Sequence, residues 1–274
     1  YNRAFQEHGL LAAQVLITAD DINDRRRYLN VRNALRAMFD YGVIPIINEN
    51  DTVRTDELSR TMGDNDQLSA MVTNLIRAQL LVILTDVDGL YDGHPDDEDS
   101  EVIDMVETID EETQGLVQAG SKEGVSLSTG GMASKLRAAQ LATAAGESVI
   151  LANGHRPDVL VDLMNGKTLG TLLPGQGSRV NERKRWIGYA AQPMGTLTID
   201  SGAVKALEAK GSSLLPVGIT QLAGEFDKGD LVSVVSSAGE EIARGLTNYA
   251  SDDLAQILGQ SSEAIAGSLG RMPY

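Results

Sequence analysis

The sequence predicts an α/β fold in which helices cover both faces of a parallel sheet. Short, fully apolar runs recur along the first two thirds of the chain, amphipathic stretches separate them, and aromatic residues make up only 4% of the chain. Strands of a parallel sheet read as continuous Val, Ile and Leu runs because both of their faces are buried. Ligands of such sheets bind beyond the carboxyl ends of the strands, so polar residues that follow these runs are the first site candidates.

The apolar runs and the helical spacing place the elements in order. Strands are expected at 12–18, 43–47, 80–84, 148–151 and 170–173. Helices are expected at 28–41, 67–79, 132–145 and 158–164. Asp20 is expected to cap a helix after the first strand. The first eight residues read as the end of a helix, and the chain starts at Tyr1 instead of Met, so we expect a further N-terminal stretch before it.

The composition changes near residue 190. Short β-like runs follow at 195–199, 214–216, 231–235 and 241–245, with one helix at 203–210. We therefore predict a first domain at 1–175, a linker at 176–190 that carries a charged segment around Trp186, and a small β-rich domain at 191–274.

Charge and composition exclude several classes of protein. The chain has 23 basic and 39 acidic residues, a net charge of −16, which argues against a generally basic nucleic-acid surface. It has no cysteine, so disulfides and thiolate metal sites are excluded, and its three histidines show no ligand spacing. No apolar run reaches the roughly 20 residues that cross a bilayer. We expect a cytoplasmic protein that is not bound to a membrane.

The strongest local signal is the segment STGGMASK at 128–135. Two glycines lead into a helix N-terminus, where backbone N–H groups attract anions and a lysine in the first turn adds a charge for a phosphoryl oxygen. An ordinary glycine turn capped by Ser or Thr explains the pattern equally well. The spacing fits neither a P-loop nor a dinucleotide-binding fingerprint.

Three other polar clusters follow buried runs. In NEND at 48–51, amide groups could fix a carboxylate and Asp51 an ammonium group, and in GDND at 63–66 Asp64 or Asp66 could orient cationic side chains or a hydrated Mg²⁺. Each cluster taken alone fits a polar turn better, and Asp66 fits a helix N-cap. The third cluster, TDVDGLY at 85–91, is either a nucleotide site around Asp86 or an Asp-Gly turn with Tyr91 packed as a lid.

Together these motifs resemble the glutamate 5-kinase family of the amino-acid kinase superfamily. The resemblance rests on INEND, GDND, LTDVDGLY and STGGMASK in this order, and on the later segments RKRW at 183–186 and GSSLLP at 211–216. It covers nearly the whole chain. It implies an α/β, three-layer amino-acid kinase sandwich, truncated at its N-terminus, followed by a small β-rich PUA barrel.

The resemblance also implies the reaction and its residues. Such kinases transfer the γ-phosphoryl group of ATP, with Mg²⁺, to the side-chain carboxylate of L-glutamate, the first step of proline biosynthesis. Glutamate would contact Asn48, Asp51 and Asn65. Catalysis would depend on Lys135 and on Asp66 as an organiser of lysines. The nucleotide would contact Thr85, Asp86, Thr129, Gly130, Gly131, Met132, Ala133, Ser134 and Lys135.

The resemblance further implies feedback inhibition by proline and a homo-oligomer. Three departures stand out. The Lys-Leu-Gly strand and the glycine-rich segment with which the family begins are absent, so the chain as written is expected to be inactive. The loop between Asp51 and Gly63 is longer than usual, and His94 stands before Pro95 where relatives often carry Asp.

Two alternatives remain open at this point. One is another amino-acid kinase, acting on acetylglutamate, aspartate, UMP or a small phosphate. The other is a non-catalytic RNA-binding or regulatory protein with a kinase-like body. The residues after 191 include few basic ones, and phosphate contacts need positive charge, so we expect the PUA-like region to be regulatory or structural.

Overall fold

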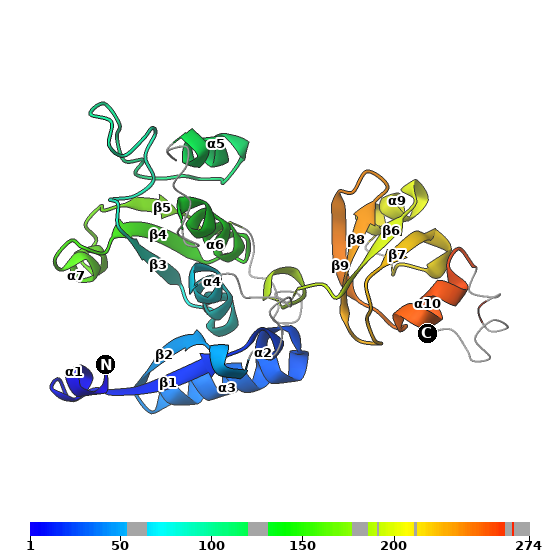
Figure 1. Cartoon of the computed structure of the whole chain (residues 1–274), viewed down its shortest axis with the longest axis horizontal. Helices are drawn as coiled ribbons and strands as arrows, with labels where there is room; N and C mark the ends of the chain where they lie inside the picture. Colours follow the sequence, from blue (N-terminus) through cyan, green and yellow to red (C-terminus); the bar gives the residue numbers. More distant parts are fainter. Residues whose placement is uncertain are drawn as a thin grey trace. The chain divides into compact units, whose positions relative to one another are not determined.

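A computed structural model shows the chain as two compact units, Tyr1–Ala190 and Ala191–Tyr274 (Figure 1). The structure describes residues 1–53, 65–119, 131–176, 186–190, 192–210, 213–260 and 265. The finer division into 1–175, 176–190 and 191–274 stays a prediction.

The first unit begins with a parallel strand pair. After α1 (Asn2–Gln6), β1 (Leu11–Ile17) pairs in register with β2 (Val43–Glu49), and α2 (Ala19–Asn23) and α3 (Arg25–Asp40) connect them. The prediction that Asp20 caps α2 was wrong. The N-cap is Thr18, because Thr18 and Asp21 complete a reciprocal capping box. Gly42 has a φ of 66°, which lets the chain turn sharply from α3 into β2.

A second sheet contains β3 (Leu80–Thr85), β4 (Ser148–Asn153) and β5 (Thr171–Leu173). β3 and β4 are parallel, but β5 is antiparallel to β4, so the prediction of a wholly parallel sheet was wrong at this strand. The chain turns back after α7 (Val159–Met164), and Gly170 takes a φ of 73° against the Leu151 carbonyl. A side chain at 170 would overlap that carbonyl oxygen, so glycine is required there.

Two helices join these sheets into one unit. α4 (Asn65–Ile76) packs against α6 (Met132–Ala144), and α4 also touches β2 of the first sheet and β3 of the second. The helix pair approaches closely because small residues line the contact, and Ala70, Ala138, Ala139 and Ala142 are all fully buried. A short turn η1 (Asp51–Val53) follows β2, and α5 (Glu111–Ala119) is a helix that the sequence pattern did not predict.

The second unit is β-rich. Its strands β6 (Gly195–Ile199), β7 (Ile219–Ala223), β8 (Leu231–Ser236) and β9 (Glu241–Leu246) form a sheet in the order β7-β6-β8-β9. The strand predicted at 214–216 was wrong: Pro216 opens the short turn η3 (Pro216–Gly218), and β7 starts after it. Two helices, α9 (Ser201–Lys210) and α10 (Ser251–Ile257), complete the unit.

The described helices were expected to be too short or too polar to span a membrane. Within the part of the chain that the structure describes, no helix has both the length and the apolar character needed to cross a bilayer.

Candidate active site

The centre of the candidate site is an ion pair between α4 and α6. Lys135 lies in the first turn of α6, and its Nζ atom is 3.0 Å from Oδ2 of Asp66 at the start of α4. The two side chains are only 12% and 15% exposed. They are 69 residues apart in sequence, so the packing of the two helices brings them together. A charge-assisted hydrogen bond in such a sheltered place fixes the lysine ammonium group.

The N-terminus of α6 offers backbone donors next to this lysine. Gly131 precedes the helix in an extended conformation, and Met132, Ala133, Ser134 and Lys135 form its first turn. The Ser134 and Lys135 N–H groups donate to the Gly131 carbonyl at 2.9 and 3.3 Å. The N–H groups of Met132 and Ala133 precede the first helical hydrogen bonds and carry the partial positive charge of a helix N-terminus. Among the described residues, no heavy atom lies within 4 Å of the place where a Cβ atom of Gly131 would stand. Thr129 and Gly130 lie outside the described residues.

The residues predicted to bind glutamate lie at the end of β2 and the start of α4. Asn48 is exposed near the carboxyl end of β2, Asp51 is exposed in η1, and Asn65 is exposed at the first position of α4. The loop after β2 is tied to β1, because the Asn50 N–H donates to the Ile17 carbonyl at 2.9 Å. Gly63 and Asp64 lie outside the residues that the structure describes.

The residues predicted to meet the nucleotide follow β3. Thr85 donates from its hydroxyl to Asp86 at 3.0 Å, and the Asp86 side chain is exposed. The neighbouring end of β4 adds contacts that sequence reasoning missed: Asn153 donates to Oδ1 of Asp88 at 2.8 Å, and the His155 N–H donates to Asn153 at 2.9 Å. The signal for Asn153 was its place just after an apolar run, the same signal that identified Asp86.

Tyr91 lies in the loop that follows β3. It makes an isolated antiparallel bridge with Val102, and its side chain is half-buried. Burial and the neighbouring Asp88 carboxylate raise the pKa of the Tyr91 phenol. The tyrosine therefore stays protonated at neutral pH.

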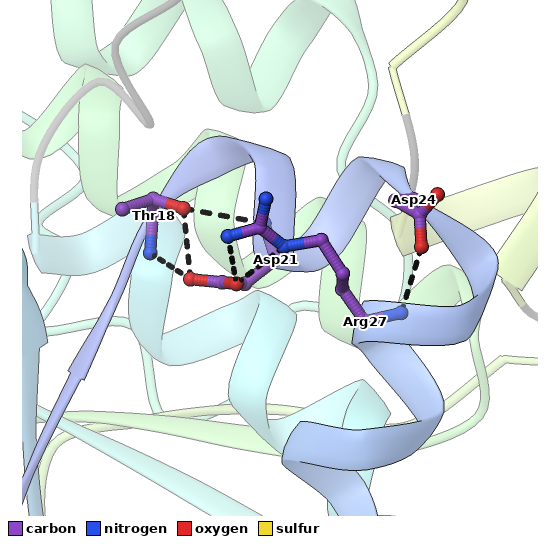
Figure 2. Close-up of polar contacts among 4 residues, drawn as sticks. All are labelled: Thr18, Asp21, Asp24 and Arg27. Carbon is purple, nitrogen blue, oxygen red and sulfur yellow. Dashed lines mark hydrogen bonds and ion pairs between the residues drawn. The ribbon is translucent and has the colours of Figure 1, made fainter.

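A separate polar corner, which we define as Thr18, Asp21, Asp24 and Arg27, follows β1 (Figure 2). Asp21 accepts from the backbone N–H and the hydroxyl of Thr18, each at 2.8 Å, and its Oδ1 lies 2.9 Å from an Arg27 terminal nitrogen. Burial raises the pKa of the Asp21 carboxyl, but the Thr18 hydrogen bonds and Arg27 outweigh it and lower the pKa overall. The sequence signal for this corner was the spacing Thr-x-x-Asp before a helix.

The second unit contains a cavity of about 460 Å³. Residues 243–249 line one side of it and residues 213–216 another, together with apolar core residues such as Val234 and Leu254. None of the residues predicted to bind ATP or glutamate lines this cavity.

Acidic and imidazole groups are the side chains of this chain that could bind a metal ion. Among residues 1–53, 65–119, 131–176 and the described parts of the second unit, no three or more of them gather in a metal-binding cluster. A Mg²⁺ ion that travels with a nucleotide needs only one or two carboxylates besides the phosphates. Asp86, exposed at the end of β3, offers one such carboxylate.

Comparison with known proteins places this geometry in a family. Residues 1–153 match the amino acid kinase family and residues 195–269 match the PUA domain. A "Glutamate 5-kinase" of Chromohalobacter salexigens is 47% identical over 272 residues, which are 99% of this chain and 71% of the relative. A "Glutamate 5-kinase" of a Marinomonas species is 44% identical over 271 residues, or 98% of this chain and 71% of the relative.

Solved structures give more distant similarities. A carbamate kinase from Giardia lamblia bound to AMP-PNP has a TM-score of 0.45 at 17% identity, covering 64% of this chain and 66% of that one. The isopentenyl phosphate kinase of T. acidophilum in its product complex has a TM-score of 0.39 at 21% identity, covering 62% and 63%. On the strength of the sequence relatives, which match almost its whole length, the chain belongs to the glutamate 5-kinase family.

Proposed function

We propose that the enzyme to which this chain belongs carries out the reaction that its family is named for. It phosphorylates the side-chain carboxylate of L-glutamate with ATP and gives L-glutamyl 5-phosphate, the first intermediate of proline biosynthesis. The observation that carries this proposal is the match to glutamate 5-kinases over 99% of the chain. The sheltered Lys135–Asp66 pair at a helix N-terminus gives the reaction a physical basis.

The chemistry needs charge neutralisation more than proton transfer. A carboxylate is already a nucleophile, so no general base is required, and the main obstacle is repulsion between glutamate and the ATP phosphates. In-line positioning and positive charge at the transferred phosphoryl group then supply most of the rate acceleration. Lys135 and the first N–H groups of α6 are suited to this task.

Asp66 is assigned an organising role. Its carboxylate lies 3.0 Å from the Lys135 ammonium and is only 15% exposed, which restricts the lysine to one position. A lysine that is already in place loses no side-chain entropy when the transition state forms. Asp66 thus acts through Lys135 and not as a proton acceptor.

The remaining site residues are assigned by their motifs. Glutamate would contact Asn48 and Asn65 through amide groups and Asp51 through its ammonium group. ATP would contact Thr85, Asp86 and the segment from Thr129 to Lys135. A Mg²⁺ ion bound with ATP would neutralise phosphate charge, and Asp66 and Asp86 are carboxylates near the proposed site that could help to hold it.

Regulation and assembly are proposed on the family relationship alone. Proline would act as a feedback inhibitor, the enzyme would form a homo-oligomer, and it would work in the cytoplasm. The second unit would be regulatory or structural. Acidic residues outnumber basic residues ten to five in 191–274, which disfavours binding to RNA phosphates.

A phosphotransfer assay on the intact enzyme tests the proposed function. ATP consumption is followed with glutamate, acetylglutamate, aspartate and UMP as separate acceptors. The proposal predicts turnover with glutamate and its inhibition by proline. Turnover with one of the other acceptors and not with glutamate would refute it, and salt-dependent RNA binding without any turnover would favour the non-catalytic alternative.

A further inference from the structure

The turn η2 (Trp186–Ala190) carries the only tryptophan of the chain, and the structure buries it in the first unit. The Trp186 side chain is 2% exposed. Its ring N–H donates to the carbonyl oxygen of Ile22 at 2.9 Å, across 164 residues of sequence. A segment that the sequence predicts as a linker thus contains a specific long-range contact.

Aromatic and cationic groups complete the contact. The Trp186 ring meets Tyr28 edge-on, with ring centroids 6.4 Å apart and planes inclined by 60°. The Arg25 guanidinium lies 5.3 Å from the Tyr28 centroid and 5.4 Å from the Trp186 centroid, so it contacts both rings. Edge-to-face rings and cation–π contacts are directional, so they fix the orientation of the indole ring.

The contacted residues lie in α2 and α3, next to the polar corner in the sequence. Ile22 is the fourth residue of the five-residue helix α2, where a carbonyl oxygen lacks a helical partner, and the indole N–H supplies one. Arg25 and Tyr28 lie in the first turn of α3. Trp186 therefore fastens η2 to the junction of α2 and α3.

The same turn also touches the two helices of the candidate site. η2 packs against α4 and against α6, and α3 packs against α4 (Figure 1, where η2 is the yellow-green turn beside α4). α4 carries Asp66 and α6 carries Lys135. This five-residue segment thus contacts both helices that carry the Lys135–Asp66 pair, and through Trp186 it also contacts α2 and α3.

We propose that Trp186 is a positioning residue for phosphoryl transfer. Its hydrogen bond to Ile22 holds η2 against α4 and α6. The position of η2 then sets the spacing of these two helices and, with it, the position of the Lys135 ammonium group. This inference rests on the proposed function. It goes beyond it, because the described partners of the Trp186 side chain are Ile22, Arg25 and Tyr28, which are not assigned to ATP or glutamate, and Trp186 would act through α4 and α6.

The first test is the variant Trp186→Phe, which keeps an aromatic ring and removes the N–H donor. Mutations that disturb the coupling between two sites of a protein usually change it by a modest amount. We therefore expect kcat of Trp186→Phe to fall by about three- to thirtyfold at saturating ATP and glutamate. The glutamate KM stays within about twofold, because the glutamate contacts are untouched. The matched control is Ile199→Val, a fully buried position in β6 that belongs to the core of the second unit and not to the core around α6.

The control separates positioning from general stability. Both variants are assayed at a temperature at which circular dichroism shows them folded. The proposal requires kcat to fall in Trp186→Phe and to stay near wild type in Ile199→Val. Equal kcat values in the two variants, or a change confined to KM, would overturn it.

The second test uses the unchanged protein. Because Trp186 is the only tryptophan, selectively excited tryptophan emission reports on η2 alone. A non-hydrolysable ATP analogue with Mg²⁺ is expected to change this emission saturably, and Lys135→Met is expected to abolish the change, since coupling between two sites is reciprocal. If the tryptophan emission does not change when the nucleotide analogue binds, the proposal is refuted. If the emission responds but glutamate is not phosphorylated, the proposed function fails and the coupling stands.

Discussion

Two ion pairs of the first unit have almost the same length and opposite characters. Lys135 and Asp66 lie 3.0 Å apart, at 12% and 15% exposure, and they come from two helices separated by 69 residues. Arg27 and Asp21 lie 2.9 Å apart, at 52% and 20% exposure, within six residues of each other. The first pair depends on tertiary packing, whereas the second forms from local sequence.

The difference shows which kind of pair determines the chemistry. A solvent-exposed pair is screened by water and contributes about 0–1 kcal/mol to stability, so the polar corner mainly caps helices. A sheltered pair holds charge in a fixed place, and removing one partner leaves the other charge poorly solvated. Only the sheltered pair lies at a helix N-terminus where phosphate groups would bind.

The largest predicted effect is on catalysis by Lys135. The variant Lys135→Ala removes the positive charge aimed at the transferred phosphoryl group, so kcat should fall by about 100- to 1000-fold in the intact enzyme. The glutamate KM should change far less. Steady-state kinetics with varied glutamate measures both, and a large rise in KM with little change in kcat would contradict a transition-state role.

The second effect is on stability and compares the two kinds of pair. Asp66→Asn leaves the Lys135 ammonium without its carboxylate, and we expect a loss of about 1–3 kcal/mol, below the value for a fully buried pair because both side chains keep some exposure. The control is Asp162→Asn, which breaks the Lys167–Asp162 pair of 2.8 Å, where Lys167 is 60% exposed. That loss should stay below about 1 kcal/mol by urea unfolding. Equal losses of unfolding free energy in Asp66→Asn and Asp162→Asn would contradict the distinction between the sheltered and the exposed ion pair.

The third effect concerns the polar corner and pH. The folded state lowers the pKa of Asp21 below its ordinary value of 3.8, so ionised Asp21 stabilises the fold above that pH. This contribution is lost as the pH falls through the lowered pKa. Asp21→Asn should therefore be less stable than wild type by up to about 1 kcal/mol at pH 7, as for other helix caps.

The same comparison at acidic pH decides whether the carboxylate is responsible. Urea unfolding at pH 7 and near pH 2 should show the gap between wild type and Asp21→Asn closing at the lower pH. A gap of the same size at both values would mean that packing and not ionisation is the cause.

The smallest effect is at a buried amide between the two helices. Asn74 on α4 is fully buried, its Nδ2 donates weakly to the Leu141 carbonyl at 3.4 Å, and no described residue donates to its Oδ1. Asn74→Leu removes that unpaired acceptor, so stability should stay equal or rise by about 1 kcal/mol. A clear drop in the thermal midpoint would show that the Leu141 bond contributes more than its length suggests.

Local signals in the sequence predicted most of the fold. The apolar runs at 43–47, 80–84 and 231–235 are strands, because a short run of Val, Ile and Leu is a local signal. The expected burial of both faces holds for much of β8, whereas β2 has no fully buried residue and β3 has one. The choice of Thr18 over Asp20 as the cap, and the start of β7 after Pro216, depend on single hydrogen bonds and backbone angles that residue type alone does not decide. The antiparallel direction of β5 is set by its pairing with β4, a contact between segments distant in the sequence that local patterns do not show.

The candidate site was only partly visible in the sequence. The glycine pair and Lys135 have a local signature, and the family resemblance supplied roles for Asp66 and Asn48. No sequence pattern pairs Asp66 with Lys135, or Asn153 with Asp88, since these contacts bridge 69 and 65 residues. Trp186 was read as part of a charged linker because its partners, Ile22 and Tyr28, are far away in the chain.

A double-mutant cycle tests most directly whether the sheltered pair acts as one unit. kcat is measured for Asp66→Asn, Lys135→Met and the double variant in the intact enzyme. If Asp66 acts through Lys135, the double variant should be about as slow as Lys135→Met alone. Effects that multiply, with the double variant slower by the product of the two single losses, would contradict this account.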